Sequence, residues 1–159
     1  MNKKQLLENI IKQLELDRKV LMDAALATYQ AATNEESKPE NEYDTRGLEA
    51  SYLAGAQAKR VADLDEQISI FKKLEIKEFS NQSSVAATAL IEVDIEGEHK
   101  FLFMLPKGGG FVMQFEGKSI QIVTPSSPSG EALLGLKVGD IAIVETANKT
   151  KEYEIISVS

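Results

Sequence analysis

The two halves of this chain follow different hydrophobic periods, and this change constrains the fold more than any other feature. Up to about residue 78, apolar and small residues recur every three or four positions, which is the helical period. Beyond residue 80 apolar and polar residues alternate, as in strands. Only Pro39, Gly47 and Gly55 precede residue 80, whereas three prolines and eight glycines follow it. The change of period predicts an α+β chain with a helical first part and a β-rich second part.

Two helical stripes occupy the first part, and a proline-containing break separates them. The first stripe consists of Leu7, Ile11, Leu14, Leu21, Ala25, Thr28 and Ala32, and the second of Ala54, Gln57, Val61, Leu64, Ile68 and Phe71. Because proline disfavours helix for itself and its predecessor, the first helix should end before Lys38. Each helix needs a partner for its stripe, so we expect an antiparallel, coiled-coil hairpin over residues 1–78.

The second part reads as a small, mostly antiparallel sheet with one short helix. Extended segments are expected at 89–95, 100–105, 111–115, 119–123, 141–145 and 151–156, and a helical turn at 130–135. The polar stretch 79–84 suits a linker, so 85–159 is the expected C-terminal domain. Gly108–Gly110 lacks the Lys-Ser/Thr of a phosphate loop, so we interpret it as a hairpin connection.

Composition excludes several chemistries. Without cysteine the chain has no disulfide, thiolate nucleophile or Cys-type zinc site, and His99 alone cannot build a His-rich metal centre. The sequence offers His99 no evident partner, so we expect a surface residue. A net charge of −7 argues against unaided or sequence-specific nucleic-acid binding. No segment approaches the ~20 apolar residues of a membrane span, and Glu8, Asn9 and Lys12 interrupt any signal peptide, so we expect a cytoplasmic protein.

An acidic segment lies between the two expected helices, near residues 35–44. It carries five carboxylates and one lysine: Glu35, Glu36, Glu40, Glu42, Asp44 and Lys38. One interpretation is an ordinary solvated turn. The other is a set of oxygen ligands for Mg²⁺, which tolerates an incomplete protein shell and would take its remaining ligands from a partner. Both interpretations remain open, and Glu40, Glu42 and Asp44 are the candidate metal ligands and catalytic residues.

Three stretches of the sequence resemble one known family. The run Ser127–Asp140 is similar to the signature Ser-Pro-x-x-x-Ala-Leu-x-Gly-x-x-x-Gly-Asp of the Gre-factor family of bacterial transcript cleavage and elongation factors. Residues 151–155 resemble the closing strand of the family, and residues 60–68 resemble part of its second helix. The resemblance implies a coiled-coil hairpin followed by a C-terminal domain of FKBP-like fold.

The resemblance also implies a partner and a mechanism. Such factors bind RNA polymerase, with the C-terminal domain at the rim of the secondary channel and the hairpin inside it. In cleavage-competent members a tip Asp and Glu help to hold a second Mg²⁺ for hydrolysis of backtracked RNA. This implies no intrinsic cofactor, Mg²⁺ shared with the polymerase, and a factor that is not itself an enzyme.

The signature carries over to seven candidate polymerase-binding residues. They are Ser127, Pro128, Leu133, Leu134, Gly135, Gly139 and Asp140. The alternative is that the proline and glycines shape turns while the leucines fill the core, and the two roles are compatible.

At the tip this chain departs from the family pattern Gly-Asp-Leu-x-Glu-Asn-x-Glu-Tyr. It reads Ser-Lys-Pro-Glu-Asn-Glu-Tyr-Asp over residues 37–44, which places Glu40 near the family Asp and Tyr43 near the family Glu. A shift of one residue offers Glu42 or Asp44 instead. Three hypotheses therefore stand: a cleavage-stimulating elongation factor, a non-catalytic inhibitor that occupies the channel, and an FKBP-type peptidyl-prolyl isomerase. We expect a monomer rather than an oligomer.

Overall fold

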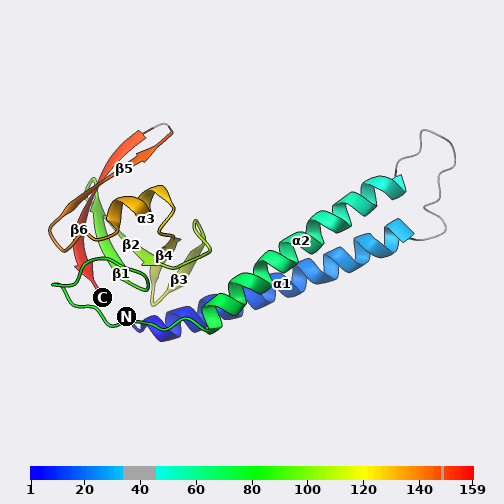
Figure 1. Ribbon diagram of the computed structural model, residues 1–159, viewed down its shortest axis with the longest axis horizontal. Coiled ribbons are helices and arrows are strands. Elements are labelled where there is room, and N and C mark those ends of the chain that lie inside the picture. Colours follow the sequence, from blue (N-terminus) through cyan, green and yellow to red (C-terminus); the bar gives the residue numbers. More distant parts are fainter. Residues whose placement is uncertain (34–45, 148) are drawn as a thin grey trace. The chain divides into compact units, whose positions relative to one another are not determined.

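The computed structural model describes residues 1–33, 46–147 and 149–159 (Figure 1). The chain forms two compact units, one made of Leu7–Leu74 and the other of Met1–Leu6 together with Glu75–Ser159. The expected α+β class is confirmed. The expected division of the chain into a hairpin (1–78), a linker (79–84) and a C-terminal domain (85–159) stays a prediction. No helix within the described ranges has the length and apolar character needed to cross a membrane.

The first unit is a pair of long helices, α1 (Lys3–Thr33) and α2 (Arg46–Lys72). Glu15 pairs with Lys72 at 2.6 Å, and Arg18, further along α1, pairs with Asp65, which lies earlier in α2. The two helices therefore run antiparallel, as expected, and Figure 1 shows them side by side. Their buried side chains within this unit include Leu7, Ile10, Leu14, Ala25, Ala54, Val61, Ile68 and Phe71. These residues follow the predicted stripes, with Ile10 added.

The seam between the helices changes character along its length. Near the start of α1 and the end of α2, the buried residues are large, such as Leu14 and Phe71. Toward Thr33 and Arg46 the buried residues are Ala25 and Ala54. The seam residue Gln57 has a buried side-chain oxygen without a hydrogen-bond partner among the described atoms. This end of the pair therefore buries less apolar surface per turn.

The second unit is built on a six-stranded sheet with strand order β3-β4-β2-β1-β6-β5. The strands are β1 (Leu90–Ile95), β2 (Glu98–Met104), β3 (Val112–Phe115), β4 (Lys118–Val123), β5 (Ile141–Thr146) and β6 (Lys149–Val158). Every neighbouring pair is antiparallel except β2 and β4, which are parallel. The mostly antiparallel sheet is thus confirmed, with one parallel pair.

The expected hairpin across Gly108–Gly110 is wrong. Strand β2 pairs with β4, and β3 pairs with β4, so the glycines connect strands that are not neighbours. Strand β4 buries Ile120 and Ile122, whereas β3 buries only Phe115. The more apolar strand therefore takes the inner position in the sheet, and the more polar β3 takes the edge.

The short helix α3 (Pro128–Leu133) packs against β5. Leu133, fully buried, joins the core formed by one face of the sheet. This core includes Val85, Ala89, Ile91, Val93, Ile95, Leu102, Met104, Val123, Ala142, Ile155 and Val158. Leu133 therefore anchors the middle of the Ser127–Asp140 segment in this core.

Candidate functional site

The Ser127–Pro128 pair starts α3. The Ser127 side-chain oxygen accepts hydrogen bonds from the backbone N–H groups of Gly130 at 3.1 Å and Thr124 at 3.2 Å, and its hydroxyl donates to the Thr124 carbonyl at 2.8 Å. Pro128 occupies the first turn, where a missing N–H costs nothing. The Ser-Pro of the signature is therefore a helix cap joined to a preorganised first turn.

Gly130 sits where a side chain does not fit. A Cβ atom built on it would lie 1.8 Å from the Thr124 carbonyl oxygen and 3.0 Å from the Ser127 hydroxyl oxygen. Its backbone does not need the left-handed region, so the requirement is close approach rather than a positive φ. Sequence reasoning missed this residue, because the matching signature position is unspecified and only the fold brings Thr124 against it.

The end of α3 is anchored to distant parts of the sheet unit. Leu134 donates its N–H to the Gly130 carbonyl at 3.0 Å, and Gly135, at φ 84°, donates to the Val85 carbonyl at 2.8 Å. Gly139, at φ 88°, donates to the Ile155 carbonyl at 2.8 Å. Both glycines adopt the left-handed conformation that other residues rarely take. The turn-forming interpretation of these glycines thus has a geometric basis.

Asp140 closes the signature. Its carboxylate accepts the backbone N–H of Lys137 at 2.8 Å, and its carbonyl accepts the N–H of Ile155 at 3.0 Å. Of the seven candidates, Leu134 is the large apolar residue that stays exposed, at 47%. The structure brings the seven together in one capped, anchored segment. Their role in polymerase binding stays a prediction.

The other candidates, Glu40, Glu42 and Asp44, lie outside the described residues. Within the described ranges, no group of three His, Asp or Glu side chains is arranged to hold a metal ion. Metal binding at the tip therefore stays a prediction from the chemistry of its carboxylates.

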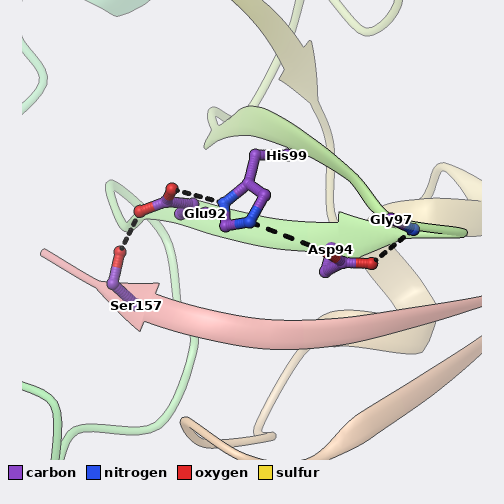
Figure 2. A network of polar contacts seen from close by, with 5 residues as sticks. All are labelled: Glu92, Asp94, Gly97, His99 and Ser157. Atoms are coloured by element: carbon purple, nitrogen blue, oxygen red, sulfur yellow. Dashed lines mark hydrogen bonds and ion pairs between the residues drawn. The ribbon is translucent and has the colours of Figure 1, made fainter.

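His99 has partners that the sequence did not reveal (Figure 2). Its Nδ1 lies 2.9 Å from Glu92 Oε1, and its Nε2 lies 3.7 Å from Asp94 Oδ2. The register between β1 and β2 sets Asp94 opposite His99, and Glu92 lies two residues along the same strand. Ser157 on β6 donates to the other Glu92 oxygen at 3.2 Å, and Gly97 donates to Asp94 at 2.8 Å.

This network changes the acidity of Glu92. The hydrogen bond from His99 lowers the pKa of the Glu92 carboxyl, the Ser157 hydroxyl lowers it further, and partial burial opposes both. The network spans three strands and is half-exposed, with the His99 side chain 54% exposed. It can hold the ends of these strands together. The sequence could have predicted that Asp94 and His99 face each other, because a turn at 96–97 places positions 94 and 99 opposite each other on paired strands.

The C-terminal part of the chain matches a known protein family. Residues 114–159 match the family described as "Transcription elongation factor, GreA/GreB, C-term". The match covers α3 and the whole Ser127–Asp140 segment. Transcription elongation factor GreA of Thermotoga maritima is 26% identical over 153 residues, which cover 95% of this chain and 91% of that protein. The chain is thus similar to a GreA factor over nearly its whole length, and its C-terminal part matches the GreA/GreB family model.

Proteins named as transcription inhibitors match this chain about as well as the GreA proteins do. Transcription inhibitor protein Gfh1 of Thermus aquaticus is 25% identical over 153 residues, covering 95% of this chain and 90% of that protein. A crystal structure of Gfh1 from Thermus thermophilus aligns with 96% of this chain and 94% of its own, at 22% identity and a TM-score of 0.38. The Gre-factor matches thus include both an elongation factor and an inhibitor.

Proposed function

We propose that this chain is a transcription regulator that binds RNA polymerase through its secondary channel. The observation that carries this proposal is the length of the GreA match, which spans 153 residues and so includes both the helix pair and the sheet unit. The anchored Ser127–Asp140 segment supplies the surface for docking at the channel rim. We further propose that the chain acts as a monomer in the cytoplasm, without binding nucleic acid on its own.

In the first version of this function, the chain stimulates cleavage of backtracked RNA. Glu40, Glu42 and Asp44 would supply carboxylate oxygens, which are the ligands that Mg²⁺ prefers. When bound, the ion polarises water and stabilises charge on the transferring phosphoryl group. The polymerase supplies the rest of the active site, so the chain lends ligands and is not itself the enzyme.

A second version is channel occupancy without chemistry, which the comparisons allow equally and the tip sequence favours. The Gfh1 inhibitor matches this chain at 25% identity and GreA at 26%, so overall similarity does not favour the elongation factor. The tip sequence also departs from the family pattern around the catalytic pair. No comparable observation favours the isomerase hypothesis: such a site needs an aromatic-lined pocket, and Phe103 and Phe115 are buried side chains of the sheet unit.

The binding experiment comes first. Immobilised full-length chain should retain purified core RNA polymerase, and a chain with Leu134→Asp should retain about 10-fold less because a charge enters an exposed apolar contact. An exposed control substitution on the edge strand far along the sheet, Gln114→Asp, should change retention little. Absence of polymerase retention by the unmodified chain would reject both versions of the function.

The cleavage experiment then separates the two versions. Stalled, backtracked polymerase complexes are incubated at fixed Mg²⁺ with and without the chain, and RNA shortening is followed. Acceleration that disappears in the Glu40→Ala, Glu42→Ala, Asp44→Ala variant, with binding retained, supports cleavage stimulation. Binding without acceleration, together with slower nucleotide addition, supports the inhibitor.

A further inference from the structure

Strand β5 forms one edge of the six-stranded sheet. It is hydrogen-bonded to β6 on one side, and no described strand pairs with its other side (Figure 1). In an antiparallel pair, alternate residues turn their backbone N–H and C=O groups away from the neighbouring strand. The outer side of β5 therefore carries backbone donors and acceptors that can pair with a further strand.

The two edges of the sheet differ in their protection against such pairing. Proteins blunt an edge strand by making it short or by placing lysine or proline in it. Strand β3, at the opposite edge, has four residues, whereas β5 has six and contains neither lysine nor proline. Two large β-branched side chains of β5 are also exposed, Ile141 at 54% and Ile143 at 49%. Strand β5 is therefore the edge that suits the addition of another strand.

Ile141 and Ile143 lie on the sheet face opposite α3. Side chains alternate between the two faces of a strand, and the intervening Ala142 belongs to the core to which α3 contributes. On the neighbouring strand β6, Glu154 lies opposite Ile141, and Glu152 lies opposite Ile143. Directly opposed residues share a face, so the two isoleucines stand beside two glutamates. We call Ile141, Ile143, Glu152 and Glu154 the β5 edge surface.

The charge on this face selects the kind of partner. Glu152 and Glu154 are exposed, and Glu145, which shares the face of the two isoleucines, is exposed near the end of β5. The lysines of the β5–β6 hairpin, Lys149 and Lys151, alternate with these glutamates and so lie on the other face. Apolar side chains beside a row of carboxylates complement a partner that carries positive charge.

A second copy of the chain fits this edge poorly. If the β5 strands of two copies paired, the sheet would continue from one copy into the other. The glutamates of both copies would then share one face, where like charges destabilise the pairing. The same negative charge disfavours nucleic acid, whose phosphates need positively charged contacts. The remaining class of partner is a basic protein segment.

We propose that the β5 edge surface docks an extended, positively charged segment of a protein partner, which adds to the sheet beside β5. Its backbone pairs with the outer side of β5. The aliphatic stems of its Lys or Arg side chains cover Ile141 and Ile143, and their charged ends reach Glu152 and Glu154 on β6. The proposal goes beyond the polymerase function and does not depend on it, because it requires only β5 and β6.

The test uses the full-length chain and a synthetic hexapeptide of alternating Lys and Val with blocked ends, followed by NMR. The peptide should shift the amide signals of β5, with a dissociation constant below about 1 mM. Alternate amides of β5 should exchange more slowly with the peptide bound, because they gain hydrogen bonds. The same peptide with Glu in place of Lys should bind at least about 10-fold more weakly.

Two variants and a matched control locate the contact. Ile143→Lys places a charge in the middle of the edge and should weaken binding of the basic peptide about 10-fold. The Glu152→Gln, Glu154→Gln variant keeps the side-chain shapes and removes two charges. It should weaken binding about 10-fold at about 0.05 M salt and less at about 0.5 M, because salt screens exposed charges. The control, Val112→Lys, changes a residue that is 53% exposed on the opposite edge strand, and should bind within about 2-fold of the unmodified chain.

Several results would overturn the proposal. They are no binding of the basic peptide, equal binding of the acidic peptide, signal changes confined to other strands, and an equal loss in the control. If Ile143→Lys does not fold, the double glutamine variant decides, and unchanged affinity in that variant rejects the charged contact. A dimer at sedimentation equilibrium that Ile143→Lys abolishes would make a second copy the occupant and overturn the proposal.

Discussion

At the scale of single residues, the space around position 130 leaves no room for a side chain. The Thr124 carbonyl approaches so closely that a Cβ atom on residue 130 would lie 1.8 Å from its oxygen. Backbone atoms cannot move aside as a flexible side chain can. A substitution here must therefore displace the start of α3, and with it the Ser127 cap.

We expect Gly130→Ala to destabilise the sheet unit by about 2–4 kcal/mol, as overpacking against backbone does. The matched control is Gly55→Ala in α2, where a Cβ atom meets nothing within 4 Å and Ala is the better helix former. This control should stabilise the helix pair by about 0.5–1 kcal/mol. Urea unfolding of both variants checks the pair of predictions, and a neutral Gly130→Ala would contradict the close approach.

The pH response of Glu92 is a second prediction at this scale. Because the hydrogen bond from His99 lowers the folded-state pKa of Glu92 below the ordinary pKa of a glutamate, Glu92 contributes stability above that ordinary pKa. This contribution is lost as the pH falls through the lowered folded pKa. In His99→Gln, NMR titration should show a higher Glu92 pKa, and Ser157→Ala should raise it by less. Unchanged titration in His99→Gln would exclude the hydrogen bond as the main cause.

At the scale of elements, the helix pair is unevenly packed. Large residues such as Leu14 and Phe71 fill one part of the seam, and Ala25, Ala54 and Gln57 the other. Local opening is easiest where least apolar surface is buried. The part of the pair next to the acidic segment should therefore exchange its amide protons faster than the part near Leu14.

Gln57→Leu tests the polar position in this seam. The change removes an amide oxygen that is buried without a partner among the described atoms and adds apolar contact. We expect the helix pair to gain about 1 kcal/mol, measured by thermal unfolding followed by circular dichroism. A loss of stability would mean that the Gln57 side chain makes a stabilising hydrogen bond in solution.

At the scale of the whole molecule, one compact unit is assembled from two separate parts of the chain, Met1–Leu6 and Glu75–Ser159. Lys3, 7% exposed, joins them: its ammonium donates to the Lys77 carbonyl at 2.6 Å and the Thr88 carbonyl at 3.4 Å, and lies 4.6 Å from the Phe79 ring centre. Burial lowers the pKa of Lys3, and the charge of Glu78 opposes this shift. Thr88 is also buried and accepts the Lys77 N–H at 3.0 Å.

Lys3→Ala should therefore weaken the sheet unit, although Lys3 lies far from it in sequence. We expect a loss of about 1–2 kcal/mol, because two carbonyl groups lose a buried donor. Amide exchange at Lys77 should become about 10-fold faster, since 1.4 kcal/mol corresponds to a factor of ten. The neighbouring Lys4 is exposed, so Lys4→Ala should leave both measurements unchanged. Equal behaviour of the two variants would contradict this role of Lys3.

The sequence alone determined the type of nearly every described element, because helices and strands differ in the local period of their apolar residues. The antiparallel helix pair, the six strands and a short helix were predictable in this way, although the short helix was expected at 130–135 and lies at Pro128–Leu133. The signature also pointed to the family. These features depend on residues that are near neighbours along the chain.

Contacts between distant residues were decided only by the tertiary structure. Strand β4 enters the sheet between β2 and β3 because its apolar residues can be buried there, and no local pattern in Gly108–Gly110 records that. The position of Lys3 beside the carbonyls of residues 77 and 88 likewise depends on segments that are far apart in sequence and meet in the fold. Local periodicity specifies which face of an element is apolar, whereas packing the whole core selects which faces meet.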